Sequence, residues 1–486
     1  MKTVLASSIA TLDSNVVSGG GTDVTEQLQS VLDQAWDDGI HLIVDGAALI
    51  HGLVIHSHTT VECVSSDCGF YMADYANRPM FRNDNWNFQE RTTHDICFLG
   101  GTYNHNCTHQ AHSVPFSEFP IPERKIMPGC PTEHDIYLME FYGVENFKIS
   151  GVKFRNQRTY TVELGNFLNV TIENSVIDMA EHVHPSNQDG FHFSGPGRYL
   201  TIRNVRGCTG DDFINIGPDE FDGVSSITDV LIDGVYFTDT CQGIRMLSRG
   251  TGMLDRVTVR NVSGTYRTFA FSINPFFHAD TFGNYGDLYF ENIDLRQIEA
   301  TYNYTPLTFF QIGGNCHCIT LKNIRFHMPV RNSLLFDIGR PFFYQPCKIQ
   351  EADGGLADEY LNCEWMSETA RPHIDTFILD GLTVTGDSRM DNTNILELRY
   401  AIDHLIVKNV QIFRTDDSSC GGCLVQMQKE AEVKVMLLED IFAEKLSHIL
   451  YAEAGHQVGL LHTDNVILEY GDTVIQTDGA DVTRFL

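Results

Sequence analysis

Three aspartates lie in two copies of one short pattern. Asp189-Gly190-Phe191 is followed 22 residues later by Asp211-Asp212-Phe213, and each copy continues through a short apolar segment to a Gly-Pro pair. If the chain is a coil that returns to the same place at every turn, the two copies stack, because neighbouring parallel strands are about 4.8 Å apart. The pattern therefore predicts that three carboxylates, those of Asp189, Asp211 and Asp212, meet at one spot on the surface.

Carboxylates held this closely have a characteristic chemistry. Because like charges repel, they cannot all ionise at low cost, and we expect one of them to keep its proton near neutral pH. One protonated and one ionised carboxyl supply the acid and the base that hydrolysis of a glycosidic bond requires. Adjacent residues of a strand point to opposite faces, so Asp211 and Asp212 both contribute only if one of them lies in a turn. The competing interpretation is structural, with each aspartate solvated or capping backbone N–H groups.

The same stacking selects candidate substrate-binding residues. Residues 188–192, 210–214, 241–245 and 269–274 align as four successive coils. In this alignment Gln242 shares a column with Asp189 and Asp211, and another column holds His192, Ile214, Arg245 and Ser272. Arg245 either supplies a positive charge to the substrate or pairs with an acid, and His192 fits a packed or paired histidine as well as a ligand. The candidates for substrate binding are Asn187, His184, His192, Gln242, Arg245, Ser272 and Asn274.

Positioning these side chains requires a regular scaffold, and the sequence contains one. From Phe147 onward, alternating apolar residues ending at Asn, Gly or Asp recur, mostly 27–31 residues apart. One copy cannot bury its apolar face, but stacked copies bury a continuous core. We therefore predict an all-β fold, a single-stranded parallel β-helix, right-handed by the crossover rule. A β-propeller would need a longer period with hairpin turns. The turn positions, to which we assign a structural role only, are Gly151, Asn174, Asn204, Gly234, Asn261, Asn292, Asn323, Gly381, Asn409 and Asp440.

We expect this scaffold to form a single domain over residues 1–486. Residues 22–39 predict a helix with an apolar face, which would cover one end of the stack because solenoids need caps. Two stretches, residues 104–135 and 340–372, interrupt the repeat and predict long loops or insertions. Loops of that length are usually functional or disordered.

The composition of the chain limits the classes of partner that it can bind. The chain of 486 residues has a formal net charge of −31, which argues against nucleic acid and anionic membranes as partners. No apolar run is long enough to span a membrane. The start of the chain lacks the apolar core of a signal peptide, and the 13 scattered cysteines suit a reducing compartment. We therefore expect a cytoplasmic protein, either a monomer or a homo-oligomer.

Neither a metal nor a cofactor is predicted. Cys316-His317-Cys318 and Cys420-Gly421-Gly422-Cys423 contain paired cysteines, but neither has a second pair at zinc-finger spacing.

At the three aspartates the chain resembles glycoside hydrolase family 28, the polygalacturonase and rhamnogalacturonase family. That family carries Asn-x-Asp-Gly and, about a coil later, Gly-Asp-Asp; here Asn187-Gln188-Asp189-Gly190 and Gly210-Asp211-Asp212 match these motifs. The resemblance implies a parallel β-helix and an inverting mechanism. In that mechanism Asp211 would protonate the leaving oxygen, while Asp189 and Asp212 would activate a water on the opposite face.

The later motifs depart from the family. Its Gly-His-Gly is replaced by Cys241-Gln242-Gly243, and its Arg-Ile-Lys, which holds a galacturonate carboxylate, by Ser272-Ile273-Asn274. We therefore expect a glycoside hydrolase that cleaves an α-glycosidic bond next to a sugar other than galacturonate. The substrate would be a pectin-type or other plant or microbial oligosaccharide. The two long loops favour exo action, since they would close one end of the cleft.

Two alternatives stay open. A polysaccharide lyase or epimerase on the same fold would bind Ca²⁺ at the aspartates and use Arg245 as the base, because oxygen ligands suit Ca²⁺. A non-catalytic β-helix would bind glycans without turning them over.

Overall fold

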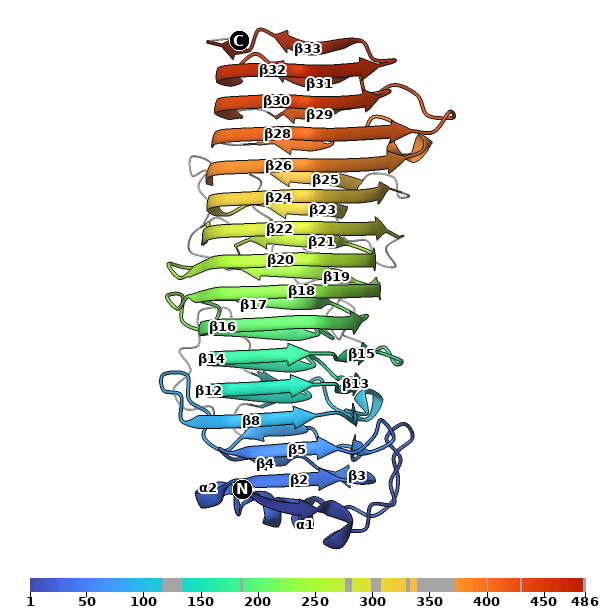
Figure 1. Ribbon diagram of the computed structural model, residues 1–486, viewed down its shortest axis with the longest axis vertical. Coiled ribbons are helices and arrows are strands. Elements are labelled where there is room, and N and C mark those ends of the chain that lie inside the picture. The colour runs from blue at the N-terminus through green and yellow to red at the C-terminus, as the bar shows by residue number, and fades with distance from the viewer. Residues whose placement is uncertain are drawn as a thin grey trace. The chain divides into compact units, whose positions relative to one another are not determined.

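The computed structural model describes residues 1–115, 133–183, 187–275, 282–298, 307–328, 333–338, 372–399, 401–428 and 431–483. These residues divide into two compact units, Met1–Cys241 and Gln242–Leu486. In each unit nearly all regular structure is β-strand, and strands one coil apart pair in parallel (Figure 1). The expected fold class, an all-β parallel β-helix, is confirmed. A single domain over residues 1–486 stays a prediction.

The first unit begins with a short strand and a 3-10 turn, which two short helices and then stacked strands follow. Its helices are α1 (Thr25–Leu32), α2 (Ala35–Asp38) and the 3-10 turns η1 (Ala6–Ser8) and η2 (Cys107–His109). Its strands are β1 (Lys2–Leu5), β2 (Ile40–Val44), β3 (Ala47–Ile50), β4 (Leu53–Ile55), β5 (Thr59–Cys63), β6 (Gly69–Met72), β7 (Phe81–Asn83), β8 (Thr93–Leu99), β9 (Thr102–Asn104), β10 (Ser113–Pro115), β11 (Glu133–Asp135), β12 (Met139–Ser150), β13 (Lys153–Arg155), β14 (Val162–Glu173), β15 (Val176–Asp178), β16 (Phe191–Gly207), β17 (Asp212–Gly217) and β18 (Ile227–Thr240).

The described residues of the second unit form stacked strands and one 3-10 turn, η4 (Ser388–Met390). Its strands are β19 (Gln242–Leu247), β20 (Met253–Tyr266), β21 (Phe269–Asn274), β22 (Asn284–Gln297), β23 (Leu307–Ile312), β24 (Asn315–Met328), β25 (Ser333–Ile338), β26 (His373–Gly386), β27 (Leu396–Leu398), β28 (Ala401–Arg414), β29 (Cys423–Met427), β30 (Glu432–Glu444), β31 (His448–Glu453), β32 (Gln457–Glu469), β33 (Thr473–Asp478) and β34 (Asp481–Val482).

The recurring turn residue works as the repeat predicts. In the first unit Asn174 and Asn204 have left-handed φ angles of 54° and 51°. Asn204 Nδ2 donates to Asn174 Oδ1 at 2.6 Å. In the second unit Asn323 Nδ2 donates likewise to Asn292 Oδ1 at 2.6 Å. Asparagine tolerates this backbone conformation and bonds locally, so the asparagine ladder fixes the register of the long strands and holds the apolar residues on one face.

The predicted N-terminal helix is confirmed in position but not in length. The expected helix over residues 22–39 is two helices, α1 and α2, with a break at Asp33 and Gln34. Its apolar face is buried as expected, since Leu28 and Leu32 have no exposed surface. The Gln29 side chain joins the helix to β4: its Nε2 donates to the carbonyl of Val54 at 3.0 Å and its Oε1 accepts from the Val54 N–H at 2.8 Å.

The stretch expected to be one long loop, residues 104–135, contains regular structure. It includes η2 and an antiparallel pair in which Val114 of β10 lies opposite His134 of β11. Residues 116–132 and nearly all of 340–372 lie outside the described residues.

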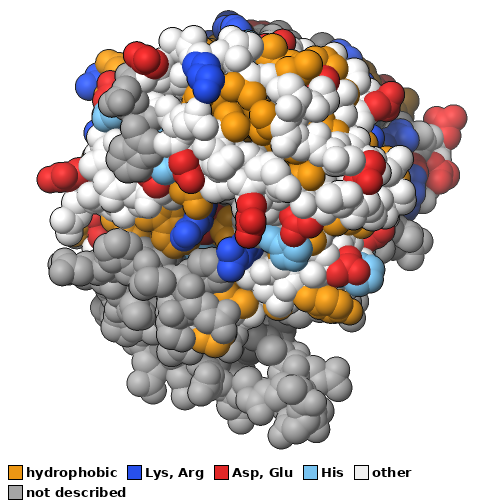
Figure 2. Space-filling model, turned by 90° about the horizontal axis from the view of Figure 1, so that it is seen from below, with side chains coloured by type: hydrophobic (Ala, Val, Ile, Leu, Met, Phe, Trp, Pro, Cys, Tyr) orange, Lys and Arg blue, Asp and Glu red, His pale blue; other side chains and the backbone are white. Residues whose placement is uncertain are grey.

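The charge is dispersed on the face seen from below in the view of Figure 1. There, acidic side chains are scattered among uncharged and basic ones rather than gathered in one large patch (Figure 2). Within the part of the chain that the structure describes, no helix has the length and hydropathy needed to cross a membrane.

Candidate active site

The three predicted acids lie together in the first unit. Asp189, Asp211 and Asp212 each offer a carboxylate oxygen, and these oxygens lie within 4.8 Å of one another. Asp189 sits in the turn before β16, Asp211 in the turn before β17, and Asp212 is the first residue of β17. One member of the Asp211–Asp212 pair therefore does lie in a turn, the condition under which both side chains reach one site.

A glycine allows the two coils to approach at this point. The Gly190 N–H donates to the carbonyl of Asp212 at 2.8 Å. A Cβ at residue 190 would stand 2.3 Å from the carbonyl oxygen of Phe213, too close for any side chain. The glycine that follows Asp189 is thus required by the close packing of the coils that carry the acids.

The register of the two coils differs by one residue from the expected alignment. Phe191 pairs with Ile214 and His192 with Asn215, so the coil repeats after 23 residues rather than 22. Placing His192 opposite Ile214, and Asp189 opposite Asp211, was therefore wrong. Counting back along the two strands, Asp189 is level with Asp212. A shift of one residue exchanges the two faces of a strand, and here it brings Asn215 to the surface that carries His192.

His192 is held between carboxylates. Its Nδ1–H donates to Asp189 Oδ2 at 3.1 Å and its Nε2–H to Glu220 Oε2 at 2.8 Å. Glu163 Oε2 lies 3.9 Å from His192 Nε2, and the side chains of His192 and Glu163 are both almost completely buried. Burial alone would lower the pKa of His192, but Glu220, Glu163 and Asp189 together raise it well above its usual value. A raised pKa favours the imidazolium, the form in which both ring nitrogens donate.

The ring of Tyr160 closes one face of the imidazolium. The two rings are stacked with centroids 4.4 Å apart and planes inclined by 6°. This contact leaves His192 little rotational freedom, so the direction of its Nδ1–H toward Asp189 is fixed. His192 is thus paired with two carboxylates and packed against Tyr160. Binding of substrate by His192 stays a prediction.

Sequence reasoning missed Glu220 and Asn215. Glu220 follows β17, and a Cβ at Gly217 would come within 2.6 Å of its Oε2. The Gly-Pro pair that closes the second copy of the pattern therefore also makes room for this glutamate, a signal that was visible but not used. Asn215 Nδ2 donates to Asp212 Oδ2 at 3.2 Å. Asp189 and Asp212 each accept a hydrogen bond from the residue three positions later.

The other residues of the first unit that the sequence predicts to bind substrate have few contacts that bear on this role. Asn187 is partly buried, and its Nδ2 is 3.5 Å from the hydroxyl of Tyr160. Its neighbour Gln188 is buried and donates from Nε2 to the carbonyl of Gln157 at 2.7 Å, a structural contact. His184 lies outside the described residues.

Four predicted binding residues belong to the second unit. Arg245 pairs in register with Ser272, as the alignment predicts. Its Nη2 donates to Gln242 Oε1 at 2.9 Å, and the guanidinium lies over the ring of Phe269, 5.1 Å from the centroid. Asn274 Nδ2 donates to Ser272 Oγ at 3.3 Å. Binding of substrate by these residues stays a prediction.

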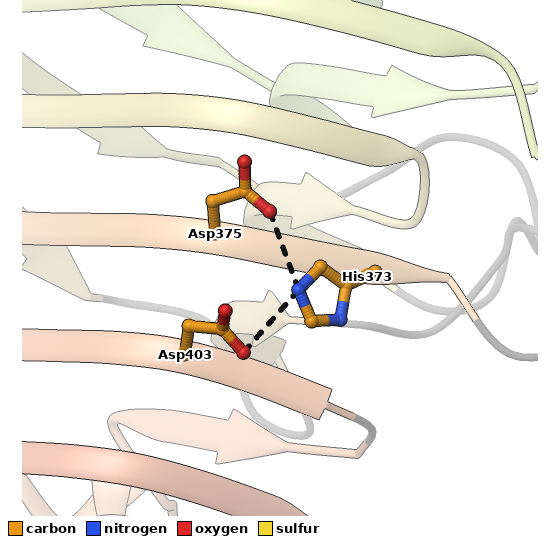
Figure 3. A group of neighbouring side chains, drawn as sticks. All are labelled: His373, Asp375 and Asp403. Carbon is orange, nitrogen blue, oxygen red and sulfur yellow. Dashed lines mark ion pairs between the residues drawn. The ribbon is translucent and has the colours of Figure 1, made fainter.

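Among the described residues, two groups of three side chains are arranged so that they could share a cation. The first is the aspartate cluster itself, whose oxygens suit Ca²⁺. The second is His373, Asp375 and Asp403 in the second unit, where both carboxylates approach one imidazole nitrogen (Figure 3). Lys434 Nζ lies 2.7 Å from Asp403 Oδ1, so an ammonium already compensates this carboxylate.

Known proteins resemble the chain in sequence over one region and in fold over nearly all of it. The model of glycosyl hydrolases family 28 matches residues 129–305. The Yersinia enterocolitica family 28 exopolygalacturonase is 13% identical, with 98% of this chain and 78% of that chain covered and a TM-score of 0.50. The Azotobacter vinelandii mannuronan C-5 epimerase AlgE6 A-module is 10% identical, with 98% of each chain covered and a TM-score of 0.47. No curated protein sequence matches the chain.

At 13% identity the Yersinia structure supports the fold alone, whereas the family model bears on the acids directly. The matched region contains Asp189, Asp211 and Asp212 together with His192 and Glu220. The resemblance indicated by the two aspartate motifs is therefore confirmed: residues 129–305 of this chain carry the sequence pattern of glycosyl hydrolases family 28.

Proposed function

We propose that the protein is a glycoside hydrolase that cleaves an α-glycosidic bond with Asp189, Asp211 and Asp212. The observation that carries this proposal is the meeting of three carboxylate oxygens within 4.8 Å, inside the region that matches family 28. Charges this close in a partly desolvated site favour a shared proton. One acid can then protonate the leaving oxygen while the ionised carboxylates activate water.

The hydrogen bonds support a division of labour. Asp189 accepts from the His192 imidazolium and Asp212 from the Asn215 amide, and both contacts favour the ionised carboxylate. Asp211 is more exposed than the other two acids, which are almost fully buried. These contacts suit Asp189 and Asp212 as the bases that hold the water and Asp211 as the acid, the roles that the family resemblance implies.

The distance between the carboxyl groups of a glycosidase is related to whether the enzyme inverts or retains the anomeric configuration. Inverting glycosidases usually hold their two carboxyl groups about 6.5–9.5 Å apart and retaining ones about 5–5.5 Å apart. The nearest oxygens here, within 4.8 Å, are closer than the usual inverting distance. We propose inversion because two acids that share one water can lie close together. NMR of the first product from an α-linked substrate should therefore show the β anomer; an α product would assign one aspartate as a nucleophile.

The substrate is proposed to be a pectin-type or other plant or microbial oligosaccharide, cleaved next to a sugar without a carboxylate. Ser272 and Asn274, which stand where the family has Arg and Lys, carry no charge. Exo action and a cytoplasmic location belong to the same proposal. The test is incubation with a panel of neutral and acidic oligosaccharides, followed by chromatography of the products over time.

A second candidate function is favoured by the ability of the same three carboxylates to hold a cation. A Ca²⁺-dependent lyase or epimerase would lose activity with a chelator, and a lyase would release an unsaturated product that absorbs in the ultraviolet. Reducing ends that appear equally with and without chelator, and without new absorbance, support the hydrolase. Glycan binding with no product would instead identify a non-catalytic binding protein.

A further inference from the structure

The second unit contains a pocket of about 360 Å³ at the C-terminal ends of four stacked strands. Arg296 of β22 pairs in register with His327 of β24, His327 with Thr385 of β26, and Thr385 with Phe413 of β28. Parallel strands are about 4.8 Å apart, so these four side chains form one row along the pocket wall. None of these residues belongs to the aspartate site in the first unit.

Three arginines line this pocket, although the chain has only 33 Lys and Arg against 64 Asp and Glu. Arg389 Nε donates to Asp387 Oδ1 at 2.8 Å, and Arg414 Nη2 donates to Asp391 Oδ1 at 2.6 Å. No carboxylate of a described residue forms an ion pair with Arg296, which is exposed. Among the described residues, carboxylates therefore pair with Arg389 and Arg414 but not with Arg296, an arrangement that leaves this guanidinium available to a negatively charged ligand.

Arg414 has hydrogen-bond donors that no described residue uses. Its side chain has no exposed surface. Its Nε and Nη1 nevertheless have no hydrogen-bond partner in the part of the chain that the structure describes. Buried polar groups without a partner are uncommon in native structures. A ligand or water that enters beside Arg414 would supply the missing acceptor, and the planar guanidinium fork fits a carboxylate especially well.

The uncharged part of the wall suits a sugar ring. Phe413 is 39% exposed and offers a flat apolar surface, while Thr385 and His327 offer polar groups on the neighbouring strands. His327 is itself placed by Thr385, with Nδ1 and Oγ1 2.7 Å apart, and its Nε2 lies 3.4 Å from Asp294 Oδ1. A volume of about 360 Å³ is near the lower limit for small-molecule sites, which fits one or two rings.

We propose that this pocket binds a carboxylate-bearing sugar residue, a uronate, of an acidic oligosaccharide. Arg296 would contact the carboxylate, and Phe413 would lie against the ring. The proposal does not depend on hydrolysis at the aspartates, because it concerns different residues in the other unit. If both proposals hold, the chain combines cleavage next to a neutral sugar with a separate site for an acidic one.

Calorimetric titration with galacturonate and glucuronate oligosaccharides tests the pocket. Arg296→Gln removes the guanidinium that has no ion-pair partner among the described residues, and it should weaken binding at least tenfold. Arg325→Gln is the matched control, since it removes the same charge from β24 at a position outside the pocket, where Arg325 Nη1 lies 3.5 Å from Asp294 Oδ2. Circular dichroism and thermal melting of both variants check that they fold like the unmodified protein.

The expected result is uronate binding by the unmodified protein and Arg325→Gln, a loss in Arg296→Gln, and weaker binding of neutral oligosaccharides. Three results would overturn the proposal: equal affinity in the two variants, equal binding of neutral and acidic sugars, or tighter binding of inorganic phosphate than of uronate. Phe413→Ala should also weaken uronate binding, and unchanged affinity in that variant would exclude the stacking role. Failure of the hydrolase proposal appears in a different assay, as absence of product.

Discussion

Two groups built from the same kinds of side chain differ in what they can do. In the first unit His192 lies 3.1 Å from an oxygen of Asp189 and 2.8 Å from one of Glu220. In the second unit His373 lies 3.2 Å from Asp375 and 3.3 Å from Asp403 (Figure 3). The side chain of His192 is 3% exposed, whereas that of His373 is 41% exposed. The distances are nearly equal, so burial is what separates the two groups.

Burial changes the strength of every charge interaction. Exposed ion pairs are screened by water and salt and contribute little, while pairs away from water interact strongly. At His192 the carboxylates overcome the cost of burial and raise the pKa of the imidazole. At Asp403 the hydrogen bond from Lys434 is the main cause of a lowered pKa, and this lysine is itself exposed. Burial and the carboxylates favour one protonation state of His192, whereas the second group is exposed to solvent.

The largest effect should follow removal of a carboxylate from the buried group. Asp189→Asn and Asp211→Asn should each lower kcat/KM by at least about 10²-fold, because each replaces an acid or base that acts in the transition state. The measurement is initial release of reducing ends from the substrate that the panel identifies. Asp403→Asn is the matched change in the exposed group and should leave the rate unchanged. Undiminished activity in Asp189→Asn or Asp211→Asn would remove the catalytic assignment.

A smaller loss is expected when the imidazolium that holds Asp189 is replaced. His192→Gln keeps one N–H donor but removes the positive charge, so Asp189 loses both its orientation and part of its stabilisation as an anion. We expect kcat to fall about 10–100-fold, at or below the lower end of the roughly 10²–10⁴-fold range for acid–base assistance, with KM changed little. Glu220→Gln should also lower kcat, because Glu220 accepts from the other ring nitrogen, Nε2, and so helps to orient the imidazole.

The pH profile of His192→Gln separates positioning from simple loss of structure. With His192 replaced, the acidic limb of the rate profile should move to higher pH, because Asp189 then holds its proton more tightly. A merely structural role would lower the rate equally at every pH. His373→Gln should leave both the rate and the profile unchanged; a shift there would refute the contrast between the two groups.

Stability should show the same contrast through its dependence on pH. The folded pKa of His192 is raised above its unfolded value near 6.5, so its contribution to stability is complete below that pH. The contribution is then lost as the pH rises toward the folded pKa, by up to about 1.4 kcal/mol per pH unit. The difference in unfolding free energy between the unmodified protein and His192→Gln should therefore shrink above pH 6.5 in denaturant titrations. A constant difference from pH 5 to 9 would show that His192 does not gain its charge on folding.

The sequence alone was sufficient to predict the structural repeat and the clustering of the three aspartates. Asparagines such as Asn204 and Asn323 mark the turns because they tolerate a left-handed backbone, and that property can be recognised from residue type alone. Asp189 and Asp211 could be brought together because a stacked coil returns to the same place. Spacing did not reveal the exact register, since one extra residue in the turn before Asp212 changes the repeat from 22 to 23.

Other features depend on side-chain directions that no repeat specifies. Glu220 reaches His192 from a turn after β17, a contact that requires both the bend at Pro218 and the absence of a side chain at Gly217. The helical spacing of apolar residues also did not reveal that α1 ends at Leu32 and α2 begins at Ala35. The pocket arginines come from different elements, Arg296 from β22, Arg389 from η4 and Arg414 from β28, and the stacking of the coils brings them together.

The smallest effect is expected at the exposed group. His373→Gln removes one partner of Asp375 and Asp403, but water and Lys434 remain available to both carboxylates. We expect the free energy of unfolding to change by no more than about 0.5 kcal/mol, as for surface substitutions in general. Raising the salt concentration should reduce that change further, because exposed pairs are screened. If His373→Gln instead destabilised the protein as much as His192→Gln at pH 6, equal distances rather than unequal burial would govern both groups, and His373 would deserve the same catalytic scrutiny as His192.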